Sequence, residues 1–173
     1  MILLTVGTQL PFDRLVRALD AWCAASGRTD VFGQIGAVGS QGYRPKHFEW
    51  SEFLAPGKLD QLARQADLVV AHAGMGSIIS ALQYAKPIVI MPRRGALGEH
   101  RNDHQLATAA RFADRNGVFV ADDESVLPEV IARALKQADG SLQSVPDCAQ
   151  PALINAIRSF ILFGVVPADP VDS

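Results

Sequence analysis

The 173-residue sequence is poor in cysteine and has no long apolar run. Its two cysteines, Cys23 and Cys148, lie far apart and show no zinc-binding spacing. Cys23 falls on the apolar face of an expected helix, where it reads as a core thiol. No segment approaches the ~20 apolar residues that span a bilayer. The short run Met1–Val6 lacks the preceding basic residues of a signal peptide. We therefore expect a cytoplasmic protein without a metal site.

A large excess of charge of one sign is also absent. The formal net charge is −2, which gives no broad basic surface for nucleic acid. Hydrophobic residues make up 49% and charged residues 20% of the chain, an ordinary balance for a packed soluble core. The length suits one α/β domain and is too short for two complete nucleotide-binding lobes.

Short apolar runs alternate with amphipathic segments along the chain. Strands are expected at residues 2–6, 31–35, 46–50, 68–72, 88–91 and 117–120, and helices through 15–23, 59–63, 77–84, 102–115 and 126–135. This alternation predicts an α/β fold, a Rossmann-like parallel sheet with helices on both faces. We expect the α/β domain to cover residues 1–137, followed by a linker at 138–150, a helix at 151–166 and a tail at 167–173.

Two of these strands deliver polar loops to what should be one edge of the sheet. Leu68–Ala71 leads into His72–Ser77, and Ile88–Met91 leads into Pro92–Arg94. Ligands of open α/β sheets bind outside the carboxyl ends of the strands. The glycines of the first loop let backbone approach an anion, and the following helix aims free N–H groups at it. The pattern favours a phosphate site, with a compact turn as the simpler alternative.

A dense polar cluster, Glu99–Gln105, follows the second loop. It combines two histidines, two carboxylates, an amide pair and an arginine within seven residues, which is hard to explain as solvated surface alone. Asn102 or Asp103 should cap the next helix. Gln105 lies in the first turn of that helix, where it could reach a ligand hydroxyl.

Arg93 and Arg94 precede this cluster. Their guanidinium forks match the oxygens of a diphosphate. The alternative is that one or both are exposed, and we expect at most one to contact a ligand.

The first strand runs directly into Gly7–Asp13. Gly7 permits a tight turn, and Thr8 and Gln9 offer a hydroxyl and an amide at the start of a helix. A helix cap by Thr8 would explain the loop equally well. The second and third glycines of a dinucleotide fingerprint are missing, and no acidic residue ends the second strand. A nicotinamide-dependent oxidoreductase is therefore disfavoured.

Taken together, these motifs resemble a known family. The matching segments are Thr5–Thr8, Phe12–Leu15, Ala71–Ile78, Lys86–Pro87 and Asn102–Gln105. They are similar to glycosyltransferase family 28, the peptidoglycan N-acetylglucosaminyltransferase type, and more closely to its split form. In that form a small subunit holds the donor-binding lobe, the C-terminal lobe of a GT-B glycosyltransferase, and a membrane-attached protein holds the acceptor lobe. The eukaryotic example extends a dolichyl-diphosphate sugar. Bacterial examples serve exopolysaccharide or capsule assembly, and Pro92–Arg94 and Gly98–Gln105 resemble those most.

The resemblance, which covers about residues 1–137, implies a role for each matching position. The implied donor-binding residues are Gly7, Thr8 and Gln9 at the diphosphate, Phe53 and Leu54 at the end of the third strand beside the uracil, Gly74, Met75, Gly76 and Ser77 at the phosphate, Arg93 and Arg94, and His104 and Gln105 at the sugar hydroxyls. The candidate catalytic residues are His72, His104 and Glu99. Ser80 stands where the family commonly has an acidic residue that grips the ribose, so ribose binding must be weaker there or supplied elsewhere.

The first hypothesis is the catalytic, donor-binding subunit of an inverting glycosyltransferase that uses a UDP-sugar and no cofactor. It would act on a lipid-diphosphate-linked sugar at the inner face of the plasma membrane, held there by a membrane-associated acceptor-binding partner. The apolar stripe of the C-terminal helix, including Leu153, Ile157 and Phe160, predicts docking to that partner, with a homodimer as the alternative. The second hypothesis is a non-catalytic nucleotide-sugar or phosphate-binding module that regulates a partner.

Overall fold

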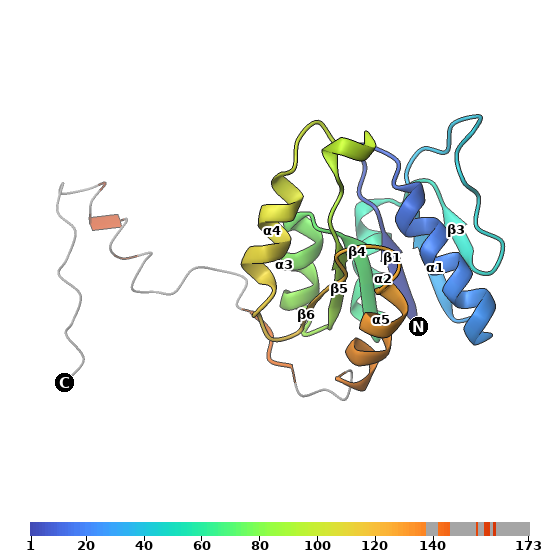
Figure 1. Cartoon of the computed structure of the whole chain (residues 1–173). Helices are drawn as coiled ribbons and strands as arrows, with labels where there is room; N and C mark the ends of the chain where they lie inside the picture. The colour runs from blue at the N-terminus through green and yellow to red at the C-terminus, as the bar shows by residue number, and fades with distance from the viewer. Residues whose placement is uncertain (138–141, 146–154, 156–157, 160, 162–173) are drawn as a thin grey trace.

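The computed structural model describes residues 1–137, 142–145, 155, 158–159 and 161 (Figure 1). The strands are β1 (Ile2–Thr5), β2 (Val31–Gln34), β3 (Glu49–Ser51), β4 (Leu68–His72), β5 (Ile88–Met91) and β6 (Val118–Val120). They form one sheet in the order β3-β2-β1-β4-β5-β6, and each neighbouring pair is parallel. This confirms the predicted parallel sheet. The expected linker, C-terminal helix and tail fall mostly outside the described residues.

Helices cover both faces of the sheet (Figure 1). The helices are α1 (Asp13–Ser26), α2 (Pro56–Gln65), α3 (Met75–Gln83), α4 (His104–Phe112) and α5 (Leu127–Lys136), with a short 3-10 turn η1 at Gly95–Leu97. Successive strand residues point to opposite faces, so Leu4 packs in the core under α1 and α5, whereas Leu3 packs in the core under α2, α3 and α4. Both faces are therefore dry, which explains why β1, β4 and β5 read as unbroken apolar runs.

Most element boundaries follow the sequence pattern, and three do not. β3 begins at Glu49, three residues later than expected, and it ends at Ser51, so Phe53 and Leu54 follow the strand and do not end it. Helix α3 begins at Met75 because Gly74 takes an extended backbone at its N-cap. Helix α4 begins at His104.

The expected side-chain cap of α4 is wrong for Asp103 and partly right for Asn102. Asp103 occupies the N-cap position, but its carboxylate accepts a hydrogen bond from the N–H of Gly95 at 2.7 Å and caps no amide of α4. The Oδ1 of Asn102 accepts the N–H of His104 at 3.3 Å. Asp103 thereby connects η1 to the start of α4, and the side chain of Asn102 accepts the hydrogen bond from the first N–H group of α4.

The strand order places the site. β1 and β4 are neighbours, yet the chain leaves β1 toward β2 and leaves β4 toward β5, on opposite sides. A crevice opens at the carboxyl ends of two strands whose connections diverge in this way. The residues after Thr5 and after His72 border that crevice, because Thr5 pairs with Ala71 in the register of β1 and β4.

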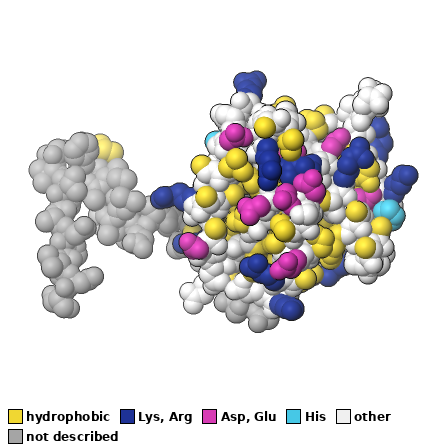
Figure 2. All heavy atoms as spheres, viewed as in Figure 1, with side chains coloured by type: hydrophobic (Ala, Val, Ile, Leu, Met, Phe, Trp, Pro, Cys, Tyr) yellow, Lys and Arg dark blue, Asp and Glu magenta, His cyan; other side chains and the backbone are white. Residues whose placement is uncertain are grey.

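The surface carries charges of both signs. On the face shown in Figure 2, basic and acidic side chains are interspersed with apolar ones over the described residues. In the part of the chain that the structure describes, none of the helices has both the length and the apolar composition to cross a membrane.

Candidate functional site

A cavity of about 590 Å³ opens at this crevice. It is lined by most of the residues that the sequence singled out: Gly7, Thr8, Gln9, Phe53, Leu54, His72, Gly74, Met75, Gly76, Ser77, Arg93, His104 and Gln105. These residues come from five separate segments of the chain, and the sheet topology brings them together. The cavity is large enough for a nucleoside diphosphate or a drug-sized ligand.

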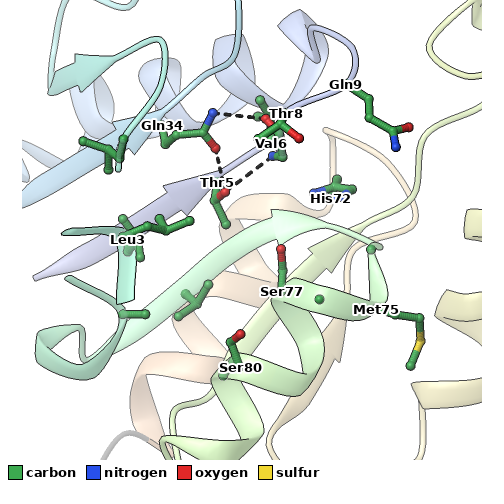
Figure 3. A pocket seen from close by; sticks show the side chains of 18 of the residues that line it. Leu3, Thr5, Val6, Thr8, Gln9, Gln34, His72, Met75, Ser77 and Ser80 are labelled. Atoms are coloured by element: carbon green, nitrogen blue, oxygen red, sulfur yellow. Dashed lines mark hydrogen bonds between the residues drawn. The ribbon is translucent and has the colours of Figure 1, made fainter. Parts of the chain in front are cut away.

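The start of α3 forms one wall of the cavity. No side chain of a described residue caps this helix, so among these residues the N–H groups of Met75, Gly76 and Ser77 keep the unpaired state of first-turn amides. The hydroxyl of Ser77 lies beside them, and Ser77 and Ser80 stand on the side of α3 that faces β1 (Figure 3). Free amides and the positive end of the helix dipole attract an anion.

The loop after β1 forms the opposite wall. Gly7 adopts a positive φ of 77°, which only glycine adopts without strain. No hydrogen bond between described residues uses the N–H of Thr8 or Gln9. Two sets of free amides, one from this loop and one from α3, therefore border the same cavity.

The buried side chain of Gln34 connects this loop to β1 and to the segment after β3. Its Oε1 accepts the hydroxyl of Thr5 at 2.8 Å, and its Nε2 donates to the carbonyl of Gly7 at 3.0 Å (Figure 3). Nε2 also donates to the carbonyl of Glu52 at 2.8 Å. Gln34 is 2% exposed. Sequence analysis overlooked Gln34, although a glutamine within a buried apolar strand is itself a signal, because such an amide must find buried partners.

His72 ends β4 and packs between the two walls. A Cβ placed on Gly7 would stand 2.9 Å from its Cε1, and one placed on Gly74 would stand 2.8 Å from its Cδ2. Both glycines are thus required for the imidazole to fit. Burial and the charge of Arg93 lower the pKa of His72 to about 4, so the ring is neutral at pH 7 and acts as a hydrogen-bonding group. Its Nδ1 has no partner among the described residues.

Two further imidazoles, those of His100 and His104, lie just before and at the start of α4. The rings of His100 and His104 meet edge to face with their centroids 4.5 Å apart, and both line the cavity. The Oδ1 of Asn102 contacts Nδ1 of His104, which leaves Nε2 as the nitrogen available to a substrate. Burial and the neighbouring His104 lower the pKa of His100. Sequence analysis counted His100 in the polar cluster but gave it no role.

Gln105 lies deeper in the cavity wall and is 3% exposed. Its Oε1 accepts the N–H of Arg93 at 3.1 Å, which fixes the orientation of the amide. Gln105 lines the cavity, and its expected contact with a ligand hydroxyl stays a prediction.

Two predicted site residues lie outside the cavity lining, which is a correction to the sequence-based expectation. The carboxylate of Glu99 accepts two hydrogen bonds from Arg14, at 2.7 and 2.8 Å, and one from the N–H of Arg94 at 2.9 Å. The guanidinium of Arg94 donates to the carbonyl of Asp122 at 2.9 Å. Glu99 is therefore committed to an ion pair, and the guanidinium of Arg94 is bound to the loop at Asp122, so neither side chain lines the cavity.

Carboxylates are scarce at this site. Asp60 is the acidic side chain that lines the cavity within the described residues, and it accepts the hydroxyl of Tyr84. Among the residues described, no three His, Cys, Asp or Glu side chains form a group suited to a metal ion. The groups that line the cavity and can bind an anionic ligand are therefore mainly backbone amides, hydroxyls and imidazoles.

The chain matches known proteins over most of its length. Residues 1–150 match the glycosyltransferase family 28 C-terminal domain. The chain is 26% identical over 172 residues to the UDP-N-acetylglucosamine transferase subunit ALG13 of Homo sapiens, which covers 95% of this chain and 14% of that protein. The Mus musculus protein of the same name is 30% identical over 122 residues, or 66% of this chain and 10% of that one. The chain thus spans about a seventh or less of these relatives.

Solved structures share the fold. The glycotransferase of kitacinnamycin aligns with a TM-score of 0.57 and 22% identity over 81% of this chain and 34% of that one. The solution structure of ALG13 aligns with a TM-score of 0.53 and 17% identity over 89% of this chain and 92% of that one. These likenesses confirm the predicted Rossmann-like sheet, equivalent to the C-terminal lobe of a GT-B glycosyltransferase. With the family match extending through residue 150 of 173, the chain belongs to the glycosyltransferase family 28 C-terminal domain family.

Proposed function

We propose that this chain is the donor-binding, catalytic subunit of a UDP-sugar-dependent inverting glycosyltransferase. The observation that carries the proposal is the pairing of two amide-rich walls, the start of α3 and the loop after β1, across one cavity at the switch point of the sheet. Such walls bind a diphosphate. The name of the human relative, a UDP-N-acetylglucosamine transferase subunit, supports uridine as the nucleoside of the donor and a two-component enzyme.

We propose one direction for the donor in the cavity. Phe53 and Leu54 line one part of the cavity and would flank the uracil, and Gly76 and Ser77 would hold the diphosphate. His104 and Gln105 would reach the sugar. The diphosphate needs no metal here, because free amides and the dipole of α3 stabilise the negative charge.

The chemistry requires a base and a stabilised leaving group. The acceptor hydroxyl oxygen forms a bond to the anomeric carbon, while the bond from that carbon to the β-phosphate oxygen breaks and its electron pair stays on UDP. The hydroxyl proton passes to a base, for which His104 is our candidate, since Asn102 orients its ring. His72 stays neutral and supports the leaving diphosphate by a hydrogen bond.

The proposal also covers the acceptor substrate and the place in the cell where the chain acts. We place the acceptor, a lipid-diphosphate-linked sugar of exopolysaccharide or capsule assembly, on a membrane-associated partner that holds this chain at the inner face of the plasma membrane. The polar motif Gly98–Gln105 supports that assignment through its resemblance to bacterial members of the split family.

Two measurements test the proposal. Thermal shift with UDP and, separately, with NAD should show stabilisation by UDP alone, because a ligand that binds only the folded state raises its stability. Transfer of label from a UDP-sugar to lipid in the presence of the membrane partner then separates an enzyme from a non-catalytic nucleotide-sugar-binding regulator. Stabilisation by NAD and not by UDP would refute donor binding, and UDP binding without turnover would favour the regulator.

A further inference from the structure

Arg93 uses its guanidinium to bind the protein's own backbone. Nη2 donates to the carbonyls of Val6 at 2.8 Å and Leu10 at 2.6 Å, and Nη1 donates to those of Pro11 at 2.5 Å and Glu99 at 3.3 Å. The residue is 2% exposed. Its position at the end of β5 is more than 80 residues from the loop that it holds.

These contacts decide which side of the loop after β1 faces the cavity. Arg93 gathers the carbonyls at both ends of the loop, those of Val6, Leu10 and Pro11, on one side. Between those ends, the N–H groups of Thr8 and Gln9 have no acceptor among the described residues. A carbonyl oxygen turned toward the cavity would repel a diphosphate, whereas an N–H group would bind it.

Arg93 also connects this loop to the opposite side of the site. Its backbone N–H donates to Gln105, the cavity residue of α4. Its guanidinium lies 4.6 Å from the centre of the Phe12 ring, at the start of α1. One residue thus fixes the positions of the loop after β1 and the first turn of α4 relative to each other.

The charge of Arg93 is buried, and no carboxylate of a described residue forms an ion pair with it. The nearby acid, Glu99, gives its carboxylate to Arg14 and offers Arg93 only its carbonyl. Burial lowers the pKa of Arg93 to about 10, so the guanidinium is still charged at pH 7. A positive charge in a low-dielectric wall strengthens the attraction of the cavity for an anion.

We propose that Arg93 is a positioning residue for donor binding: it holds the carbonyls of the loop after β1 away from the cavity, so that the amides of Thr8 and Gln9 bind the diphosphate. The sequence-based expectation is that at most one of Arg93 and Arg94 contacts a ligand, with its guanidinium matched to a diphosphate. For Arg93 we propose a role through the loop, because its guanidinium is bound to the carbonyls of Val6, Leu10 and Pro11. This inference rests on the proposed binding of a nucleoside diphosphate.

The test compares UDP with uridine, which lacks both phosphates, in titrations of wild-type protein and three variants. Arg93→Met keeps the length of the side chain and removes its donors and charge. Arg93→Lys restores the charge with a single ammonium, which cannot reproduce the fork. Arg111→Met, on the exposed surface of α4, is the matched control. We expect Arg93→Met to weaken UDP by at least about tenfold and uridine by less than about twofold, since only the diphosphate contacts are lost. Arg93→Lys should fall between, and the control should match wild type.

The result separates this role from the alternatives. Unchanged UDP affinity in folded Arg93→Met, or full recovery in Arg93→Lys, would overturn the positioning role. An equal loss for UDP and uridine would also overturn it, because general damage to the site affects both ligands. Failure of wild-type protein to bind UDP would overturn the proposed function, and this role with it.

A measurement on wild-type protein keeps the inference testable even if Arg93→Met does not fold. In an NMR titration with UDP, the amide signals of Thr8 and Gln9 should shift strongly, and the side-chain N–H signals of Arg93 should shift little. Large shifts of the guanidinium signals with unmoved loop amides would show that Arg93 binds the phosphate itself.

Discussion

Gly74 and Gly76 lie two residues apart and should respond to substitution in opposite ways. A Cβ on Gly74 would overlap with Nε2 of His72 and stand 2.8 Å from Cδ2, in a region closed by Gly7 on the other side of the ring. A Cβ on Gly76 meets nothing within 4 Å. The first change strains a packed imidazole, and the second adds a side chain at an open helical position.

The magnitudes follow from these surroundings. Overpacking at Gly74→Ala should lower the free energy of unfolding by about 1–3 kcal/mol. Gly76→Ala should raise it by up to about 1 kcal/mol, because alanine loses less backbone entropy than glycine in a helix. Gly76→Val should fold as well as wild type, yet bind UDP at least about tenfold more weakly, because its methyl groups block access of phosphate to the amides of α3.

Urea unfolding followed by circular dichroism measures the two stabilities, and a UDP titration measures affinity. Equal stability of Gly74→Ala and wild type would show that His72 is free to move and that the tight packing of this ring is wrong. Wild-type UDP affinity in folded Gly76→Val would refute the placement of the diphosphate at α3.

Three further predictions concern His72, Glu99 and His104. The pKa of His72 is lowered to about 4 in the folded state, so the unfolded chain binds more protons between pH 4 and the ordinary pKa of about 6.5. The free energy of unfolding therefore rises with pH across that window, by at most roughly 3 kcal/mol. Urea unfolding at several pH values should show this rise in wild type and a smaller one in His72→Gln, and identical slopes would contradict the prediction. Glu99→Gln should destabilise the fold by about 1–3 kcal/mol, because the side chains of Glu99 and Arg14 are only 12% and 13% exposed and form an ion pair. A double-mutant cycle with Arg14→Gln should show coupling between the two residues, and additive losses of stability would mean that the pair contributes nothing. His104→Ala, at an exposed position, should lower turnover with the partner by more than tenfold, about 1.4 kcal/mol of transition-state stabilisation, with little change in stability; full turnover would make the imidazole dispensable.

The sequence predicts the central strands better than the edges. The bounds of β4 and β5 agree with the expectation, because both strands are buried on two faces and their apolar runs end in sharply polar loops. At the edge of the sheet, β3 pairs with β2 alone, and its residues are exposed or only partly buried. Burial does not mark its bounds there, and the prediction misplaced it by three residues.

The sequence also predicts which loops line the cavity, whereas it does not predict the hydrogen-bond partners of the long side chains near it. Gly76 and Thr8 sit at strand-to-helix junctions, and the rule for parallel sheets brings such junctions to one edge. Arg93, Arg94 and Glu99 share the same stretch of sequence, yet only Arg93 lines the cavity. The partners of the Arg93 guanidinium, such as the carbonyls of Val6 and Leu10, are more than 80 residues away, a distance that no local pattern reports.

We propose above all that the cavity binds the diphosphate of a UDP-sugar between the loop after β1 and the start of α3. A two-dimensional amide NMR titration of the chain with UDP tests this most directly, because each amide reports its own contact. We predict that the largest shifts fall on Gly7, Thr8, Gln9 and on Met75, Gly76 and Ser77, with smaller ones at His104 and Gln105. No shifts at millimolar UDP, or shifts confined to residues outside the cavity, would contradict it.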